Sequence, residues 1–524
     1  MDRRTLLKGT AASLLATPAL AQPAKTATLR FVPQANLTLL DPIFTTATVT
    51  GNHGYYVFDT LYSVAADGKP KPQMAEGHTV SDNKLTWRIK LRDGLKFHDG
   101  TPVRAADCAA SIERWSKREP FGQIMAKSVE SFGAADDRTV EIKLTKPFPL
   151  LLEAIGKPDS SVCFMMPERL AKTDANKQIT EMVGSGPYRF NAKEYVSGSL
   201  VVYEKFDGYV PRGEPAEWAT GGKVCHFPRI EWKIIPDPAT ASAALQAGEI
   251  DWWEQPQADL LPLLAKDKNI TLQTDIPQGR LSILRFNCLQ APFNDVRLRR
   301  AVMMALNQED YMRASFGDDT SLWKVCRSLI PCDTPYETKE DGPWLKGDLN
   351  GAKAALKAAG YTDQKVVIIN PTDFPAIHPL GLVTADILKK IGMNVELVEA
   401  DWGTVVQRRA SKEPIEKGGW SIFHTFGSAP AYATPATSSI IRGQGQTGWF
   451  GWWESAKAEE LAQAWLDAPD EASRAKAGAE IGKLAMTDVP TVPLGQWYGK
   501  TAFRKSITGV LPGVSPYPWG VKPA

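Results

Sequence analysis

Hydrophobic and polar residues alternate in short segments of the chain. Residues 78–100, HTVSDNKLTWRIKLRDGLKFHDG, alternate on both sides of the polar tetrad Ser81–Lys84. This pattern is typical of a β-hairpin with an Asp-Asn turn. Nearer the start, TLRFV at 28–32 predicts a strand and NHGYYVFDTLY at 52–62 predicts a helix. The first part of the chain is therefore expected to mix strands with helices.

Other segments repeat hydrophobic residues with helical spacing. Residues 293–312, FNDVRLRRAVMMALNQEDYM, predict one amphipathic helix. Its hydrophobic stripe consists of Leu298, Ala301, Val302, Ala305 and Leu306. The three arginines 297, 299 and 300 fall largely off this stripe, and we interpret them as a solvated face.

Helical and strand-like segments alternate over long stretches. Asp237-Pro238 and Gly248 bound one predicted helix, in keeping with the residues that usually start and stop helices. Residues 349–410 then read as helix, strand, helix, strand and helix. Such alternation favours βαβ units and a largely parallel sheet, so we expect an α/β fold.

The N-terminus has the pattern of an export signal. Arg3, Arg4 and Lys8 precede an apolar run that ends in the small-residue triplet Ala19-Leu20-Ala21. The adjacent arginines resemble a twin-arginine signal, although Leu6 stands where that signal usually has Phe. The run is well short of the roughly 20 residues that cross a bilayer. We therefore expect a signal peptide over 1–21, cleavage near Ala21 and a periplasmic mature protein.

Length and charge narrow the function. A chain of 524 residues is too long for one hydrophobic core and suggests two or three domains. The formal net charge of +2 becomes zero once residues 1–21 and their three basic and one acidic side chains are removed. A protein without excess positive charge is poorly suited to bind the phosphates of nucleic acids, so no nucleic-acid partner is expected.

Six cysteines in an exported chain can form disulfides in many combinations. Only Cys326 and Cys332, in CRSLIPC, lie close in sequence, and Pro331 favours a turn between them. A small disulfide loop is therefore a candidate. A zinc site is poorly supported, because no histidine lies nearby at ligand spacing.

Sequence signatures of catalysis are lacking. The chain has no G-x-S-x-G or H-E-x-x-H motif, and GPYRF and GQGQTG lack the context of phosphate-binding loops. A carboxylate pair of the glycosidase kind stays open among 59 acidic residues. The class of binding proteins is thus favoured, with a secreted hydrolase using a carboxylate pair as the alternative.

Several stretches together resemble the family 5 solute-binding proteins, the extracytoplasmic receptors of ABC importers for oligopeptides, dipeptides and nickel. They are LDP at 40–42, GLKFHDGTPVRAADC at 94–108, GSGPYRF at 184–190, ALQAGEID at 244–251, the segment 286–310 and DVPTVPLG at 488–495. Their order and spacing cover nearly the whole chain. The resemblance implies a type II periplasmic-binding-protein fold, in which two lobes are hinged around a ligand cleft and an extra domain is inserted.

The same resemblance implies domain boundaries and a mechanism. Lobe I would comprise 26–48, 186–280 and 498–524, the extra domain 49–185, and lobe II 281–497. The protein would act as a monomer without catalysis or cofactor, closing on a small peptide-like or carboxylate-bearing solute and delivering it to an ABC permease in the inner membrane. A chaperone-like or sensory binder without a permease is a further alternative.

The resemblance also indicates cleft residues. In peptide-binding relatives, a stretch after Gly-Trp carries an aspartate that pairs with the peptide's ammonium group. Here Gly419-Trp420 is followed by Phe423 at that position and then by His424. A buried amine would therefore need another carboxylate, for which Glu416, Asp251 and Glu254 are candidates by motif.

The segment ADWGTVVQRRA resembles the family's acidic-Trp segment and places Trp402 and Arg409 in the cleft. We therefore expect Trp402, Arg409, Trp420, Phe423 and His424 to form one pocket that binds a carboxylate. Trp252 and Trp253 are adjacent on a predicted strand and would face opposite sides, with one toward the cleft. His53 is expected near the boundary between the lobes. A nickel role for His53 or His424 would rest on only two isolated histidines.

Overall fold

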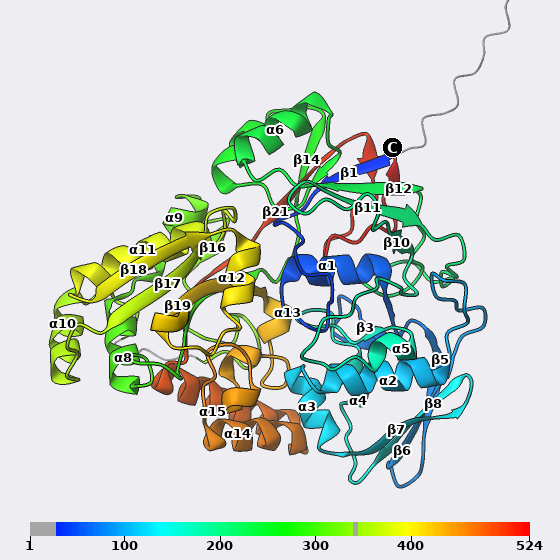
Figure 1. Cartoon of the computed structure of the whole chain (residues 1–524), viewed down its shortest axis with the longest axis horizontal. Coiled ribbons are helices and arrows are strands. Elements are labelled where there is room, and N and C mark those ends of the chain that lie inside the picture. The colour runs from blue at the N-terminus through cyan, green and yellow to red at the C-terminus, as the bar shows by residue number, and fades with distance from the viewer. Residues whose placement is uncertain (1–27, 339–343) are drawn as a thin grey trace, which may run out of the picture.

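The computed structural model describes residues 28–338 and 344–524. The chain forms two large sheets, each the centre of one lobe, and a smaller sheet in an extra domain (Figure 1). The predicted signal peptide, residues 1–21, lies outside the described residues. In the part of the chain that is described, no helix is long and apolar enough to cross a membrane.

Lobe I is built on a seven-stranded mixed sheet. Its strands, in spatial order, are β10 (Tyr188–Phe190), β11 (Leu200–Lys205), β12 (Arg229–Lys233), β1 (Thr28–Val32), β13 (Trp252–Trp253), β21 (Lys500–Arg504) and β14 (Ile270–Thr274). Only the pairings of β1 with β12 and β13 are parallel. The covering helix α6 (Pro238–Ala247) begins at Asp237, whose side chain accepts a hydrogen bond from the Thr240 backbone, and ends at left-handed Gly248. The predicted start and stop of this helix are confirmed.

Helix α1 (Thr48–Val57) packs on the lobe I sheet and ends earlier than the predicted helix. The Tyr56 ring lies 4.8 Å from that of Tyr203 on β11 and 5.2 Å from that of Trp232 on β12. In contrast, residues after β11 return to the extra domain, where Lys223 pairs with Asp59 at 2.7 Å. The expected boundaries put the segment from 49 in the extra domain and Lys223 in lobe I, so both segments pack outside their expected domain.

The extra domain contains a four-stranded antiparallel sheet. Its order is β5 (Ala75–Val80), β6 (Thr86–Leu91), β8 (Thr139–Leu144) and β7 (Val129–Asp136). Strands β5 and β6 form the hairpin that the alternating pattern predicts. The helices of this domain are α2 (Ala105–Ser116), α3 (Pro120–Ala126), α4 (Leu151–Ile155) and α5 (Glu168–Ala171). Two short strand pairs complete it: β2 (Asp59–Thr60) with β9 (Phe164–Met165), and β3 (Tyr62–Val64) with β4 (Pro70–Pro72).

Lobe II is built on a six-stranded sheet. Its order is β16 (Trp323–Lys324), β20 (Thr491–Trp497), β15 (Arg280–Phe286), β19 (Ile422–Ser428), β17 (Lys365–Pro371) and β18 (Asn394–Ala400). Only β19, β17 and β18 pair in parallel. The prediction of a largely parallel sheet is therefore wrong for the other half, where β15 pairs antiparallel with both of its neighbours. The strands of that half lie outside residues 349–410 in the sequence, so the alternation of helices and strands in that segment gave no information on their direction.

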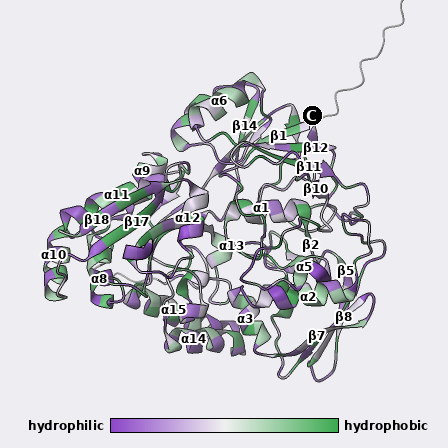
Figure 2. Ribbon diagram, in the orientation of Figure 1, coloured by the Kyte–Doolittle hydropathy of each residue, from purple (hydrophilic) through white to green (hydrophobic). Residues whose placement is uncertain are grey.

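The helices of lobe II cover both faces of this sheet. They are α8 (Val296–Ala305), α9 (Gln308–Phe316), α10 (Leu349–Ala358), α11 (His378–Lys390), α12 (Trp402–Arg408), α13 (Ala429–Tyr432), α14 (Ala456–Asp467) and α15 (Glu471–Asp488). The α10–β17–α11–β18–α12 succession matches the prediction for 349–410. The hydropathy of Figure 2 shows the hydrophobic strand β17 between these helices, whose own residues mix both classes.

The single helix predicted over 293–312 is wrong. The backbone breaks at Leu306, and Asn307 accepts a hydrogen bond from the backbone of Glu309 to begin α9. Arg299 is not solvated either, because its guanidinium is buried and donates to the carbonyl oxygens of Phe293, Asp488 and Val489. It thereby satisfies carbonyl groups at the C-terminal end of α15, which the helical pattern alone does not reveal.

The chain passes between the lobes twice. It enters lobe II between β14 and β15, and it returns to lobe I between β20 and β21. The two passages lie side by side, because Arg280 pairs with Trp497 across β15 and β20. The structure also joins Cys326 to Cys332 in a disulfide, and cysteines 108, 163, 225 and 288 are free.

Candidate functional site

Two neighbouring hollows lie between the domains. One is lined by residues 45–48 at the start of α1, by the extra-domain loop 158–162, and by Val514 and Ser515. The other is lined by Trp252, Glu254, Asp275 and Arg280 together with the same Val514 and Ser515. Because they share lining residues, we treat them as parts of one cleft.

Arg409 is a buried arginine without a carboxylate partner, and it contacts Thr46, a residue that lines the first hollow. The residue follows α12 and is 2% exposed. Its Nη2 donates to Thr46 Oγ1 at 3.2 Å, whereas its Nε has no partner. No carboxylate of the described residues compensates its charge, and burial lowers its pKa to about 10. A buried arginine in this state is costly unless an anion joins it.

Aromatic rings surround the guanidinium of Arg409. Its Cζ lies 4.8 Å from the ring centroid of Phe450, 5.6 Å from that of Trp402 and 5.7 Å from that of Phe423. These contacts stabilise a cation, but they provide no hydrogen-bond acceptor for its N–H groups. The ring cage therefore leaves donors available for the oxygens of a solute.

A second buried arginine of lobe II, Arg285, has a structural role and serves as a comparison. Arg285 is 1% exposed and also lacks a carboxylate. However, it donates to the carbonyl oxygens of Phe450 and Ile440 and to Thr491 Oγ1, at 2.7 to 3.1 Å. The difference in hydrogen bonding is what distinguishes Arg409 as a candidate ligand-binding residue.

A row of aromatic rings continues from Arg409 along the edge of lobe II. Consecutive ring centroids lie 4.5 to 5.7 Å apart in the series Trp402, Phe374, Phe426, Trp497 and Phe316. The row follows the carboxyl ends of β17, β18, β19 and β20, the edge at which open α/β sheets usually bind ligands. At its far end, Trp497 and Phe316 line a pocket.

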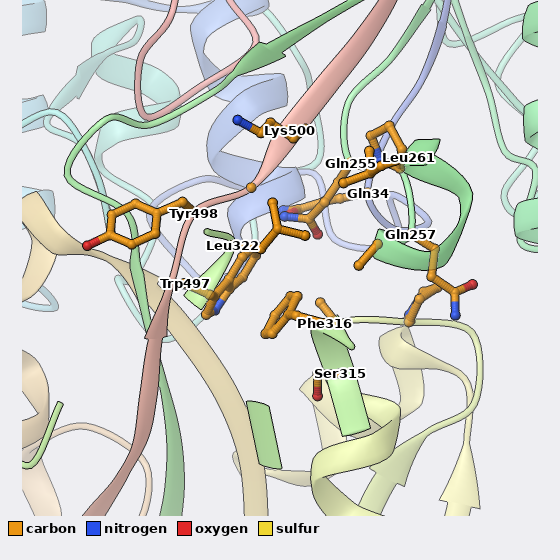
Figure 3. Close-up of a pocket in the computed structure, with 15 residues that line it drawn as sticks. Gln34, Gln255, Gln257, Leu261, Ser315, Phe316, Leu322, Trp497, Tyr498 and Lys500 are labelled. Atoms are coloured by element: carbon orange, nitrogen blue, oxygen red, sulfur yellow. The ribbon is translucent and has the colours of Figure 1, made fainter. Parts of the chain in front are cut away.

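A pocket lies at the far end of this row, between residues 255–261 of lobe I and α9 of lobe II (Figure 3). Four of its polar atoms are buried without a partner: Gln34 Oε1, Gln255 Nε2, Ser315 Oγ and Trp497 Nε1. Buried polar groups normally find partners. This outer pocket, lined also by Phe316 and Leu322, could therefore take a polar extension of a solute bound at Arg409.

Three charged residues line the second hollow, on the lobe I side. Asp275 pairs with Arg280 at 2.7 Å. Glu254 accepts hydrogen bonds from the Gln34 backbone at 2.8 Å and from Asn52 Nδ2 at 2.9 Å. Burial raises the pKa of Glu254 to about 7. Both carboxylates are thus bound to protein groups, and nothing in their arrangement favours a hydrolase.

The residues predicted for the cleft in and just before β19 fall on different sides of the sheet. Phe423 contacts Arg409, and its ring lies 5.1 Å from that of Trp420 and 5.6 Å from that of Trp449. Trp420 is fully buried behind Phe423. His424 points the other way, because neighbours in a strand face opposite sides of the sheet. Its Nε2 lies 2.7 Å from Thr384 Oγ1 on α11, inside lobe II.

Of the lobe I candidates, one lies at the cleft. Trp252 lines the second hollow and donates to Thr501 Oγ1 at 2.6 Å, while Trp253 packs on the other face in a separate hydrophobic cluster. His53 is fully buried with its Nδ1 2.9 Å from Tyr203 Oη. The two histidines are therefore engaged in different lobes, and the described residues contain no group of three or more side chains suited to hold a metal.

The three carboxylates considered for binding a buried amine do not lie together. Glu416 is exposed in a short 3-10 helix (Ile415–Lys417), and Asp251 is bound by Arg30 at 2.7 Å. Only Glu254 of the three lines the cleft. Sequence reasoning missed Thr46, Phe450 and Asp159, because no local pattern links these loop residues to the distant β19.

The sequence is similar to known proteins along its whole length. Residues 69–444 match the profile of the bacterial extracellular solute-binding proteins, family 5. The chain is 38% identical to the probable peptide ABC transporter periplasmic-binding protein y4tO of Sinorhizobium fredii, with 100% of both chains covered. It is 25% identical to the glutathione-binding protein GsiB of Salmonella typhi, over 96% of this chain and 94% of that protein.

Solved structures share the fold. The periplasmic protein AgaA of A. tumefaciens R10, solved with agropinic acid, aligns with a TM-score of 0.78 at 21% identity, covering 95% of this chain and 99% of AgaA. The protein DppA of Helicobacter pylori, solved with the peptide STSA, aligns with a TM-score of 0.77 at 21% identity, covering 95% and 98%. Identities this low support the two-lobed architecture alone.

Proposed function

The chain belongs to family 5 of the bacterial extracellular solute-binding proteins, and we propose that it captures a carboxylate-bearing, partly apolar solute and delivers it to an ABC permease. The observation that carries the choice of solute is Arg409, buried between the lobes without an anion. A carboxylate could accept two parallel hydrogen bonds from its guanidinium, a strong and geometrically selective contact. The aromatic row beside it would cover the apolar part of the solute.

Four hydrogen bonds that cross between the domains support a mechanism of closure. Arg409 and Trp449 of lobe II both donate to Thr46, Ser428 of lobe II donates to Asp159 of the extra domain, and Gln444 of lobe II donates to Gln123 of the extra domain. A solute that contacts both sides would favour the closed form over an open one. The permease would then recognise the closed form, in the periplasm and from a monomer whose signal peptide has been cleaved near Ala21.

Binding without turnover is part of the proposal. Three chemically distinct carboxylates form a first panel. They are glutathione, agropinic acid and the dipeptide Met-Leu, which is bound by a dipeptide-binding protein of Pseudoalteromonas sp. SM9913 with the same fold. We expect at least one to raise the melting temperature and to be recovered unchanged after incubation. A ligand that binds only the folded state stabilises it in proportion to the logarithm of its concentration.

Arg409→Gln tests the assignment of the carboxylate site. Loss of a charge-assisted contact in a closed cleft should weaken binding about 30-fold or more. Arg297→Gln is the control, because Arg297 is an exposed arginine of α8 paired with Asp295. Equal affinities of Arg409→Gln and wild type would exclude the carboxylate site, and product formation from any panel member would favour the hydrolase.

A further inference from the structure

Two carboxylates of the cleft, Asp159 and Glu254, have no cation of the described residues at contact distance, and Asp159 is the one that contacts lobe II. Asp159 lies in the extra-domain loop between α4 and β9 and lines the same hollow as Thr46, the residue bound by Arg409. Its Oδ1 accepts a hydrogen bond from the Ser160 backbone at 2.6 Å, and its Oδ2 accepts one from Ser428 Oγ across the cleft. These partners are neutral.

The nearest cations are committed to other carboxylates. Lys157, two residues earlier, is buried and pairs with Glu119 at 2.6 Å, and Arg280 pairs with Asp275. Burial raises the pKa of Asp159, which is the behaviour of an acidic group whose charge is incompletely compensated. Within the described chain, Asp159 thus complements Arg409: each is a cleft charge without a partner of opposite sign.

The backbone holds Asp159 in place at a conformational cost. Ser160 and Ser161 follow with φ of +53° and +66°, in the left-handed region that residues with a side chain rarely adopt. Lys157 Nζ donates to the Ser160 carbonyl at 2.9 Å and Trp115 Nε1 donates to the Ser161 carbonyl at 2.7 Å. Two buried donors therefore fix a strained turn, an arrangement that is often found where a side chain must be positioned for function.

The two unpaired charges act on a common neighbour. Burial raises the pKa of Tyr432, the charge of Asp159 raises it further, and the charge of Arg409 lowers it. The hydroxyl of Tyr432 therefore lies within the electrostatic reach of both groups. Arg409 also donates to Thr46, which lines the same hollow as Asp159, so a solute in that hollow would lie close to both charges.

We propose that Asp159 binds the ammonium group of a zwitterionic solute whose carboxylate is held by Arg409. The cationic end of the solute would thus be recognised by the extra domain and its anionic end by lobe II. Such a solute bridges the two halves of the cleft and neutralises both charges at once. This assignment rests on the proposed carboxylate site and adds the second charge that the solute must carry.

Matched probes with and without the amine test this assignment. The probes are Met-Leu and glutathione, each beside its N-acetyl derivative, measured by calorimetry on wild type and on Asp159→Asn. Wild type should bind a free-amine probe about tenfold or more tightly than its acetylated form, and Asp159→Asn should lose most of that preference. The affinity for the acetylated probe should change by less than about threefold.

Two further variants separate charge recognition from structural effects. Ser428→Ala removes the hydrogen bond across the cleft but keeps the carboxylate, so the preference for the free amine should persist. Arg409→Gln should weaken free-amine and acetylated probes alike. An undiminished preference in Asp159→Asn, or equal wild-type affinity for free and acetylated probes, would overturn the ammonium site while leaving the carboxylate site intact. Failure of all four probes to bind would overturn both sites.

Discussion

Gln444 of lobe II donates a 2.6 Å hydrogen bond to Gln123 of the extra domain. The two residues are 321 positions apart in sequence, and the sheets of their two domains share no strand. The contact joins lobe II to the extra domain, so an opening of the cleft would break it. It therefore contributes to the closed form without touching the hollows at Arg409 and Asp159.

Gln444→Ala should lower the affinity for every solute by a similar factor. One neutral hydrogen bond contributes about 1 kcal/mol, so a shift toward the open form should weaken binding roughly fivefold. Calorimetry measures the affinity, and small-angle scattering should show a more open protein without solute. Gln463→Ala is the control, since Gln463 binds Asp467 within α14. An effect on some solutes but not on others would place Gln444 in the binding site instead.

Arg409→Met should stabilise the solute-free protein. Removal of a buried charge without an anion should raise the free energy of unfolding by about 1–3 kcal/mol, because the desolvation cost disappears. Arg285→Met should instead lower it by about 2–4 kcal/mol, because carbonyl groups lose their charged donor. Urea unfolding of the two variants measures both values. A loss of stability in Arg409→Met comparable with that in Arg285→Met would indicate a structural role for Arg409.

The stability should fall in acid because of two buried histidines. Burial lowers the pKa of His53 and of His424 to about 3. Below pH 6.5 the unfolded chain binds protons that the folded protein refuses, so each histidine lowers the free energy of unfolding by about 1.4 kcal/mol per pH unit down to about pH 3. Above pH 6.5 this contribution is constant.

Glu254 opposes this trend over part of the range. Its raised pKa, about 7, means that the folded protein binds a proton more readily than the unfolded chain between pH 7 and 4.5. The comparison of wild type with His53→Gln/His424→Gln isolates the histidine contribution. Urea unfolding at pH 5 and pH 7.5 should show a smaller difference in the double variant, by roughly 4 kcal/mol at most. Equal differences in both proteins would mean that the histidines are accessible to protons.

Lys157→Met should destabilise the extra domain. Its ammonium group pairs with Glu119, whose other oxygen accepts a hydrogen bond from the Gly122 backbone at the start of α3. An unpaired buried carboxylate typically costs about 3–5 kcal/mol. The double variant Lys157→Met/Glu119→Gln should recover part of this loss, which thermal unfolding can measure. A double variant no more stable than the single one would show that the support of the Ser160 carbonyl dominates.

The sequence predicted features that depend on neighbouring residues. Asp237 and Gly248 bound α6 as expected, because capping is a property of the helix end itself. The break between α8 and α9 was missed, because the hydrophobic spacing continues through Leu306. The backbone is nevertheless extended at Leu306 and Asn307, and Asn307 caps the start of α9. Motif resemblance supplied the family and the lobes, which periodicity alone does not supply.

The candidate site was harder to predict because its residues meet through tertiary contacts. Position in the motif drew attention to Arg409 and Trp402, which the structure brings together with Phe423. It gave no information on side-chain direction, and His424 lies one residue further on the strand and therefore on the opposite face. Asp159 carries no sequence signal at all, since its relevance arises from a loop that packs across the cleft from β19.

The two chain passages between the lobes have a mechanical consequence. Arg280 and Trp497 are paired neighbours, so the two passages lie together in one narrow segment. This segment would act as the hinge in a rotation of the lobes. Figure 1 shows α3, which carries Gln123, far from β21 at this segment. A small rotation about this segment would therefore displace Gln123 and Gln444 much more than the residues beside Arg280. In the proposed closure, the contact between Gln123 and Gln444 would therefore move most and the residues beside Arg280 would move least.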